Sequence, residues 1–325
     1  MDFARQGRIV YVSMVDLSLP KGPSVNEREF LIALLDSMGD RVRAIIPEPQ
    51  NALTEVDAAR THFFPAASNR QPVRFLRSQV SLRRKTERLI HEFRPDLVVA
   101  RVGLLPWALS RLAETASPIC LKTLDDPKGF AIKNVGIKGL AARSVAPLHE
   151  YFLRRLLKRT VAADTCTTEL KQLYCAEYAF PEGNLAIVEN STNVNRFRPT
   201  DPTEARKRLG MNSFSPLIGF VGGFPEQRGG LELLEVTKRL LGDYPSIGVA
   251  VVGKCDSGAL HRRAKELGIL DRAILPGLVP YEAVPDYVNS FDIGFATGDL
   301  QWTGRVGNSY QKVRQYLACG KPVVT

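Results

Sequence analysis

The last hundred residues contain one repeated pattern, in which a short apolar run ends in a glycine turn and is followed by residues at helical spacing. The runs and their glycines are residues 217–221 with Gly222, residues 249–252 with Gly253, and residues 274–275 with Gly277. Apolar runs of this length bounded by glycine predict buried strands, and helical segments between them predict a parallel sheet. The pattern therefore constrains the chain to the α/β class, with glycine turns at the carboxyl edge of one sheet, where such sheets bind ligands.

The first glycine turn has the features of an anion site. Gly222 and Gly223 end the first run, and residues 231–241 resume at helical spacing. Glycine lets the backbone approach a ligand, and a helix N-terminus offers unpaired amides to a phosphate. Arg228, just before the helix, has the fork geometry that grips a diphosphate. Taken alone, the segment is also typical of an ordinary strand-to-helix turn with a solvated arginine, and it lacks the GxGxxG spacing of dinucleotide-binding proteins.

Further elements follow in a fixed order. Residues 282–289 predict a short helix and residues 292–296 a fourth strand. The chain then closes with a helix over residues 311–317, the turn Ala-Cys-Gly-Lys-Pro at residues 318–322, and a strand that begins at Val323.

In this order the segments resemble the family 4 glycosyltransferases of the GT-B type. The resemblance is carried by Gly222, Arg228 and Gly229, by LPGLVP at residues 275–280, by LACGKPVV at residues 317–324, and by IVENSTNVNRFRP at residues 187–199. The first half resembles the family more weakly, through RIVYVS at residues 8–13, a Gly22 loop before a helix, and the strand after Pro95 and Asp96. The resemblance implies an α/β chain of two Rossmann-like, doubly wound parallel-sheet domains facing a cleft.

The same resemblance implies a division of the chain. We expect residues 1–194 to form the acceptor-side domain, residues 195–216 a hinge with a short helix at 203–209, and residues 217–325 the nucleotide-sugar domain. Family members continue beyond the strand that begins at Val323. We therefore expect the second domain to be incomplete and the chain to be truncated, with an apolar sheet edge left exposed and stability lowered.

The resemblance implies a donor site for a nucleoside-diphosphate sugar. Its expected residues are Gly22, Gly222, Gly223, Arg228, Gly253, Leu278, Val279, Asn308, Ser309, Tyr310 and Gln315. Arg228 and Lys312 would neutralise the leaving diphosphate, as fixed charges that lower the barrier without a metal. No Asp-x-Asp pattern indicates a metal-bound donor, so no metal cofactor is expected. Two plainer interpretations stay open, an exposed helix lysine at 312 and a loop at Gly22 before a helix capped by Ser24 or Asn26.

The chain departs from the family at two positions. Family members commonly carry two glutamates eight positions apart before the closing turn, and those places hold Gly307 and Gln315 here. The arginine that often follows the first glycine is replaced by Gly223. A hydrogen bond to a neutral amide contributes about 0.5 to 1.5 kcal/mol, against about 1.5 to 3 kcal/mol for one to a charged group, so donor affinity would fall. A second hypothesis is therefore a degenerate GT-B protein that binds a nucleotide or partner without catalysis. An epimerase or phosphorylase could share the architecture.

Candidates on the acceptor side are fewer. Arg101 follows the strand predicted after Asp96, and Asp125 follows the strand over residues 119–123, so both are predicted as cleft residues with a catalytic role. Asp125 and Asp126 are equally suited to capping the next segment. The four histidines have no metal-ligand spacing. Residues 299–307, with Trp302 and Arg305, predict either a mobile lid or a plain surface loop.

The net charge of +10 is concentrated in the first 200 residues, where 29 basic and 21 acidic residues give +8, against 15 and 13, or +2, for the rest. Residues 70–94 read as a basic amphipathic helix. Its basic residues are Arg70, Arg74, Arg77, Arg83, Arg84, Lys85, Arg88 and Arg94, and its expected apolar face is Phe75, Leu76, Val80, Leu82, Leu89, Ile90 and Phe93. Such a helix predicts either contact with an anionic membrane surface near a glycan or lipid-linked acceptor, or a core helix with a solvated basic face. No zinc spacing, RNP box or helix-turn-helix signal favours nucleic acid, so no nucleic-acid partner is expected.

The expected compartment is the cytoplasm. Five cysteines form no CxxC pair and are odd in number, which fits a reduced compartment better than a disulfide scaffold. No segment resembles a signal peptide, and no apolar run approaches the ~20 residues that span a bilayer. We expect a cytoplasmic protein, peripheral at the inner face of the membrane if the basic helix binds lipid.

Overall fold

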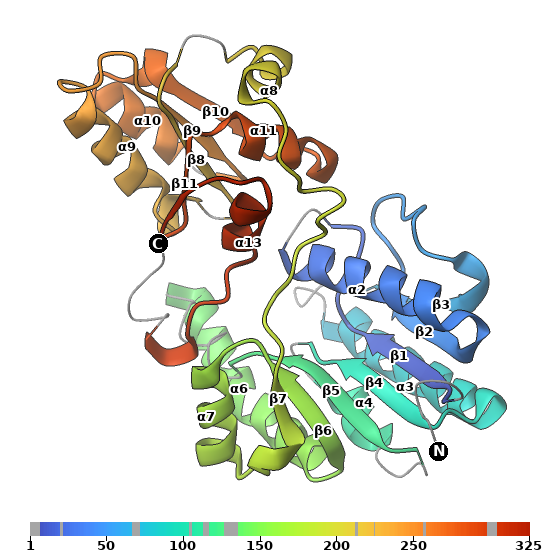
Figure 1. Cartoon of the computed structure of the whole chain (residues 1–325). Helices are drawn as coiled ribbons and strands as arrows, with labels where there is room; N and C mark the ends of the chain where they lie inside the picture. Colours follow the sequence, from blue (N-terminus) through green and yellow to red (C-terminus); the bar gives the residue numbers. More distant parts are fainter. Residues whose placement is uncertain are drawn as a thin grey trace. The chain divides into compact units, whose positions relative to one another are not determined.

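The computed structural model describes residues 7–19, 22–66, 72–103, 106–112, 117–126, 136–211, 214–223, 225–255, 258–297 and 304–325 (Figure 1). The chain divides into two compact units. The first, unit 1, comprises Met1–Leu19 and Pro23–Glu189, and the second, unit 2, comprises Pro20–Gly22 and Asn190–Thr325.

Unit 1 is built on one parallel sheet. Within the described residues the strand order is β3-β2-β1-β4-β5-β6-β7, and every neighbouring pair is parallel. The strands are β1 (Ile9–Ser13), β2 (Val42–Pro47), β3 (Thr61–Phe64), β4 (Leu97–Arg101), β5 (Ile119–Leu124), β6 (Thr160–Thr165) and β7 (Leu185–Ile187). The helices are α2 (Gly22–Met38), α3 (Pro72–Phe93), α4 (Trp107–Leu112), α6 (Gly136–Leu157) and α7 (Thr168–Tyr178), and the short 3-10 turns are η1 (Gly39–Arg41), η2 (Ala58–Arg60) and η3 (Glu182–Asn184).

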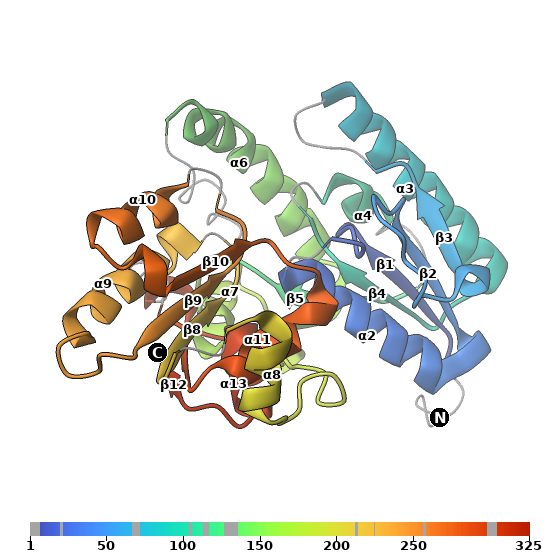
Figure 2. The same cartoon turned by 90° about the horizontal axis from the view of Figure 1, so that it is seen from above.

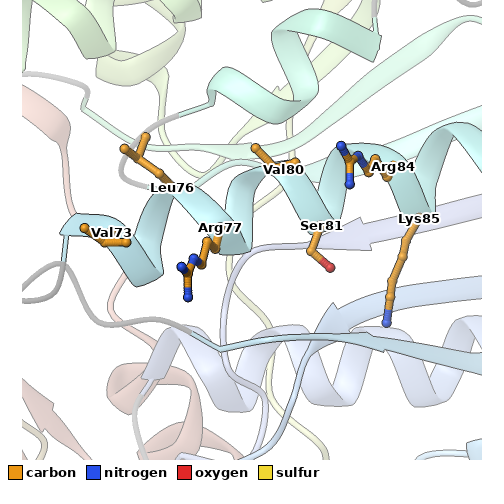
Figure 3. Close-up of a pocket in the computed structure, with 7 residues that line it drawn as sticks. All are labelled: Val73, Leu76, Arg77, Val80, Ser81, Arg84 and Lys85. Atoms are coloured by element: carbon orange, nitrogen blue, oxygen red, sulfur yellow. The ribbon is translucent and has the colours of Figure 1, made fainter.

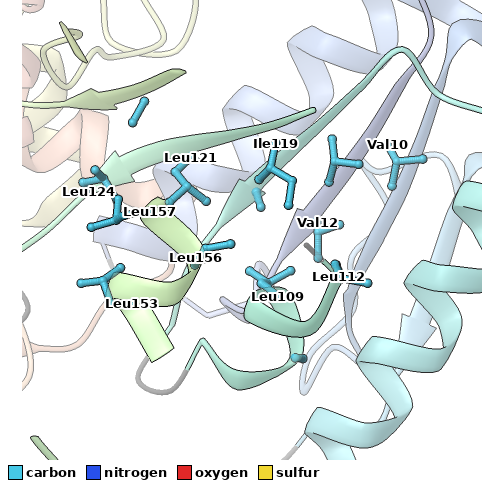
Figure 4. Close-up of a cluster of buried hydrophobic side chains, with 14 of the residues drawn as sticks. Val10, Val12, Leu109, Leu112, Ile119, Leu121, Leu124, Leu153, Leu156 and Leu157 are labelled. Carbon is cyan, nitrogen blue, oxygen red and sulfur yellow. The ribbon is translucent and has the colours of Figure 1, made fainter. Parts of the chain in front are cut away.

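Helices cover both faces of this sheet, as burial of all five residues of β1 requires. On one face, Leu31 and Leu35 of α2 pack in one cluster with Tyr11 of β1. Helices α3, α4 and α6 lie on the other face (Figure 2). Figure 4 shows this second layer, where leucines of α4 and α6 contact Val10 and Val12 of β1 and three apolar residues of β5.

Unit 2 contains a second parallel sheet. Within the described residues its order is β10-β9-β8-β11-β12, with β8 (Leu217–Val221), β9 (Gly248–Val252), β10 (Ala273–Gly277), β11 (Ile293–Phe295) and β12 (Val323–Val324). The helices are α8 (Pro202–Leu209), α9 (Gly230–Leu240), α10 (Ala259–Glu266), α11 (Val284–Ser290) and α13 (Gln311–Ala318), with 3-10 turns η4 (Pro225–Gln227), η5 (Leu270–Arg272) and η6 (Tyr281–Ala283). The strand order reverses between β8 and β11, which is the switch point where sheets of this type bind ligands. The predicted α/β class, with two Rossmann-like parallel sheets, is confirmed.

Helix α8, in the segment predicted as a hinge, is bound to the rest of unit 2. Asp201 caps it by accepting a 2.7 Å hydrogen bond from Thr203 N. Arg206 forms a 2.6 Å ion pair with Asp292, whose Oδ2 also accepts from Leu217 N at 2.7 Å. Arg208 forms a second pair of 2.6 Å with Asp286. These bonds hold α8 against α11 and the start of β8.

The loop predicted at Gly22 is wrong. Gly22 is the first residue of α2, so Ser24 and Asn26 lie inside the helix and cannot act as its N-cap. Pro23 explains the earlier start, because proline suits the first turn of a helix, where its missing amide hydrogen costs nothing. No helix in the described part of the chain is both long enough and apolar enough to cross a bilayer.

The packing of β8 generates a stability prediction. A Cβ added at Gly219 would lie 2.2 Å from the ring of Phe291, which is fully buried. We expect Gly219→Ala to lower the free energy of unfolding by about 1 to 3 kcal/mol, because overpacking displaces the ring. Urea unfolding followed by circular dichroism measures the change.

Gly242→Ala is the matched control, because a Cβ there has no heavy atom within 4 Å. We expect its unfolding midpoint to stay close to that of the wild type. Equal midpoints for the two variants would contradict the packing argument.

Candidate functional site

The strands β8, β9 and β10 each end at a glycine, and main-chain hydrogen bonds hold these three ends together. Gly222 N donates a 2.9 Å hydrogen bond to Val252 O, and Gly253 N donates one of 2.9 Å to Gly277 O. Gly222 and Gly253 both have a φ of 153°, a conformation that side chains rarely adopt. A Cβ at Gly253 would lie only 1.9 Å from Gly222 O. The two strand ends therefore approach more closely than any other residue type at position 253 would allow.

Helix α9 begins next to this edge without a side-chain cap. Gly229 is the N-cap of α9, and no side chain caps the helix there. An uncapped N-terminus offers backbone donors and a partial positive charge to an anion. Arg228 immediately precedes it and is partly buried, and among the described residues it has no carboxylate partner. The local geometry therefore suits a phosphate group.

Lys312 approaches the same turn from α13. Its Nζ lies 3.6 Å from the ring centroid of Phe220 and 5.8 Å from that of Tyr310. The ammonium is 3.0 Å from the point where a Cβ at Gly222 would lie. Lys312 as a whole residue is half-buried. Burial of its ammonium is the main cause, and the charge of Arg228 the second cause, that lowers the pKa of Lys312 to about 7. Lys312 is thus not the exposed helix lysine of the plainer interpretation.

The residues before α13 are partly engaged with one another. Tyr310 N donates a 3.1 Å hydrogen bond to Asn308 Oδ1, so this backbone amide is occupied. Ser309 is buried, and its Oγ and O accept from Asn190 N at 3.1 Å and Asn190 Nδ2 at 2.6 Å. Gln315 is 6% exposed on α13. The predicted donor-site residues Asn308, Ser309 and Tyr310 therefore all make internal hydrogen bonds.

Two predicted positions leave open space at this edge. A Cβ at Gly223 would meet no heavy atom within 4 Å, and the residue is exposed. Leu278, directly after β10, has 55% of its surface exposed, and Val279 beside it is half-buried. An exposed leucine next to a turn offers an apolar surface to a planar group such as a base. The roles of Gly223, Leu278 and Val279 stay predictions.

Arg101 and Asp125 lie at the carboxyl ends of β4 and β5, which are neighbours in the sheet of unit 1. The Arg101 guanidinium donates to Thr123 O, and Thr123 N donates a 2.8 Å hydrogen bond to Asp164 Oδ1. These bonds brace Thr123, which has the unusual φ of 50°. Arg101 therefore positions the end of β5 in this structure. Asp125 is exposed, and its Oδ1 accepts from Asp126 N at 2.9 Å.

The sequence did not predict two contacts of partly buried lysines that the structure shows. Phe220 lies inside an apolar run and gives no signal that its ring faces an ammonium. In unit 1, Lys122 forms a 2.7 Å ion pair with the buried Glu27, whose carboxylate also accepts from Tyr11 OH. Burial and Glu27 raise the pKa of Tyr11. A lysine inside the apolar run 119–124 was the one signal that could have predicted this buried pair.

Only residues 304–307 of the expected lid are among the described residues. Trp302 and the other residues of 298–303 lie outside the described residues. Arg305 is described, and it is partly buried in a helical turn over residues 304–306. Among the described residues, no group of three or more histidine, cysteine, aspartate and glutamate side chains could hold a metal ion.

Comparisons with known proteins find relatives named as glycosyltransferases. The chain is 29% identical over 180 residues to D-inositol 3-phosphate glycosyltransferase 2 of Catenulispora acidiphila, covering 52% of this chain and 39% of the relative. It is 27% identical over 245 residues to the 2-deoxystreptamine N-acetyl-D-glucosaminyltransferase of Streptomyces fradiae, covering 71% and 54%. The matches thus span about half or less of the curated relatives' length. No protein-family model matches the chain.

Solved structures agree on the architecture. Anabaena HepE in complex with UDP matches with a TM-score of 0.68 and 15% identity, covering 98% of this chain and 80% of that one. A UDP-GlcNAc 2-epimerase from Neisseria meningitidis, bound to UDP-GlcNAc, matches with a TM-score of 0.58 and 12% identity, covering 89% and 76%. At these identities the likeness establishes the fold alone. Relatives and neighbours together confirm the resemblance to GT-B glycosyltransferases.

The surroundings of Lys312 generate a pH prediction. Its pKa is lowered from 10.5 to about 7 in the folded chain, so between these values the unfolded chain binds the proton more tightly. This contribution to stability therefore rises with pH across that interval, and protonated Lys312 costs stability below pH 7. We expect Lys312→Met to be more stable than the wild type at pH 7, with the difference shrinking toward pH 10.5. Thermal unfolding at a series of pH values measures it.

Lys238→Met serves as the control, because Lys238 is exposed on α9 of the same unit. Its stability relative to the wild type should show no such trend with pH. A Lys312→Met difference that grows with rising pH would contradict the assigned environment.

Proposed function

We propose, from the premise of a GT-B chain related to glycosyltransferases, that this protein transfers a sugar from a nucleoside-diphosphate sugar to an acceptor. In the proposal, the diphosphate of the donor binds at the glycine turn of unit 2. Arg228, Lys312 and the amides at the N-terminus of α9 hold it. UDP is the first nucleotide to test, since it is bound by the structural neighbour HepE. No metal cofactor takes part in the proposed reaction.

The observation that supports this best is the pairing of two like charges. Burial, and after it the charge of Arg228, lowers the pKa of Lys312, and neither side chain has a carboxylate partner among the described residues. Bringing two cations together at a partly desolvated site costs free energy. A bound diphosphate would supply the missing negative charge, and it would draw a proton onto Lys312 and fix both cations.

The proposed chemistry follows from that charge balance. When a sugar leaves a nucleoside diphosphate, negative charge grows on the diphosphate and positive character grows on the sugar carbon. Cations already in place stabilise that charge as it forms, because they need no reorganisation during the reaction. Arg228 and Lys312 thereby take the part that a metal ion plays in other transferases. The resemblance implies a hexosyl donor and retention of the anomeric configuration.

The acceptor side is assigned to unit 1. Asp125 is the exposed carboxylate at the end of β5, and Arg101 supports that end through Thr123. We propose that Asp125 contacts a hydroxyl of a glycan or lipid-linked acceptor, with Arg101 as a positioning residue.

A second candidate function is nucleotide binding without transfer. It is favoured by Gly307 and Gln315, which stand where the family commonly has glutamates. Gln315 retains an amide oxygen that accepts a hydrogen bond, so binding would survive better than catalysis. Both candidates predict the same affinities for nucleotides. They differ only in whether the sugar is released from the nucleotide or transferred to an acceptor.

The binding proposal is tested with Arg228→Gln. We expect UDP to bind the wild type and the variant to bind it about tenfold to hundredfold more weakly, because a hydrogen bond to a charged group contributes about 1.5 to 3 kcal/mol. Isothermal titration calorimetry measures both affinities, with GDP and ADP titrated in parallel to define the base.

Arg239→Gln is the matched control, since Arg239 is an exposed cation at the far end of α9. Its affinity for UDP should equal that of the wild type. Equal losses in both variants would mean that general charge, and not the turn, attracts the nucleotide.

Transfer itself separates the two candidates. We expect the wild type to release UDP from a UDP-hexose, slowly to water and faster with an acceptor, at rates that EDTA leaves unchanged because Arg228 and Lys312 carry the charge. Coupled detection of UDP follows the reaction, and NMR coupling constants report the anomeric configuration of the product.

Tight UDP binding with no release from any sugar nucleotide would favour the binding-only candidate. Activity that EDTA abolishes and Mg²⁺ restores would overturn the metal-independent mechanism.

A further inference from the structure

The N-terminal half of α3 has its polarity reversed relative to an ordinary surface helix. Val73, Leu76 and Val80 expose 64%, 58% and 37% of their surface, whereas Ser78 and Gln79 are buried at 4% and 2%. Gln79 is held inside by a 3.3 Å hydrogen bond that its Oε1 accepts from Ala108 N. In the C-terminal half the usual order returns, with Leu82, Leu89 and Ile90 buried. Three aliphatic side chains are thus exposed to water although the helix has polar residues available.

The exposed apolar residues are accompanied by unpaired cations. Arg74, Arg77 and Arg84 are exposed, and no acidic residue occurs in the chain between Pro72 and Thr86. Later on the same helix, Arg83 pairs with Glu87 and Arg88 with Glu92, both at 2.7 Å. Among the described residues, no ion pair involves Arg74, Arg77 or Arg84. The positive charge of this half is therefore available to a partner.

Apolar and basic side chains lie next to each other along the exposed part of this half of α3. In Figure 3, Leu76, Val80 and Arg84 point to one side of α3, while Arg77, Ser81 and Lys85 point to another. The described residues around a hollow of about 570 Å³ here all come from α3, and they are Val73, Leu76, Arg77, Val80, Ser81, Arg84 and Lys85. We call Val73, Leu76 and Val80, with Arg74, Arg77 and Arg84, the α3 surface.

Helix α6 repeats the feature in the same layer of unit 1. Helix α4 contacts both α3 and α6, and the three helices lie on one side of the sheet (Figure 2). Val145, Leu148 and Tyr151 of α6, spaced three residues apart, expose 38%, 48% and 58% of their surface. The exposed apolar residues of α3 thus have counterparts on a second helix of one layer.

We propose that the α3 surface docks unit 1 onto an anionic lipid bilayer. A helix that lies in the membrane interface inserts its apolar side chains at the boundary of headgroups and acyl chains, and its cations bind anionic headgroups. The α3 surface supplies both kinds of group on one half-helix. A second copy of this chain fits less well, because it would bring three unpaired arginines against three others.

This inference concerns unit 1 alone and goes beyond the proposed transfer activity, so each stands or falls separately. It predicts binding to lipid in the absence of any nucleotide. UDP binding, measured on the same samples, reports on unit 2, and an unchanged circular dichroism spectrum with an unchanged unfolding midpoint verifies that each variant is folded.

The test is flotation of the whole chain with lipid vesicles. We expect the wild type to bind vesicles of phosphatidylcholine mixed with phosphatidylglycerol and to leave pure phosphatidylcholine vesicles unbound. Val73→Ser/Leu76→Ser/Val80→Ser should weaken binding about tenfold or more at unchanged charge, because three apolar side chains no longer insert. Arg77→Gln/Arg84→Gln should weaken it about fivefold per arginine, since each cation near the surface contributes about 1 kcal/mol.

Two controls in unit 2 match these variants. Val236→Ser/Tyr244→Ser/Leu270→Ser removes three apolar side chains that are 37%, 51% and 43% exposed, and Lys238→Gln/Arg239→Gln removes two exposed cations. Both should bind anionic vesicles as the wild type does.

Several outcomes would overturn the proposal. They are a wild type that binds no anionic vesicles, a triple serine variant that binds them undiminished, and unit 2 controls that lose as much as the α3 variants. A dimer seen by light scattering that the triple variant dissociates, without vesicle binding, would make the α3 surface a contact between copies. Binding to polyglutamate but not to vesicles would identify an acidic protein as the partner.

Discussion

The site of unit 2 depends on the main-chain hydrogen bonds that join three glycine turns. Gly222 N bonds Val252 O, and Gly253 N bonds Gly277 O, so the ends of β8, β9 and β10 form one fixed edge. Because Gly253 lies against Gly222 O, this edge cannot relax around a side chain there. A rigid edge matters for a charged ligand, since donors held in place before binding need no reorganisation.

That edge also determines the state of Lys312. With no side chain on Gly222, the ammonium of Lys312 reaches the turn and rests on the Phe220 ring, which favours a cation through its negative face. The ring does not fully replace the lost water, because burial still lowers the pKa of the lysine to about 7. The lysine is therefore balanced between its charged and neutral forms near neutral pH. A ligand with negative charge shifts that balance more easily than it would for an ordinary surface lysine.

The sequence predicted what depends on local pattern. Glycines after apolar runs gave the parallel sheets and the turn beside Arg228. The sequence did not predict the contact between Phe220 and Lys312, because 92 positions separate these residues and only the folded sheet brings them together. The sequence predicted the basic helix, which is α3 in the structure. The single apolar face predicted for this helix is wrong. Leu76 and Val80 lie outside and Leu82 inside, because polar Gln79 is buried against Ala108 of α4.

The missing glutamate at position 315 has two opposed effects. A carboxylate there would lie three residues after Lys312 on α13, the spacing at which helical side chains face each other. It would give the ammonium an internal partner and raise its pKa. Gln315 supplies no charge, so among the described residues the two cations at the turn have no carboxylate partner. In the proposed donor site, this substitution would weaken hydrogen bonding to the ribose and strengthen the attraction for the diphosphate. Departure from the family pattern at this position is therefore compatible with a working donor site.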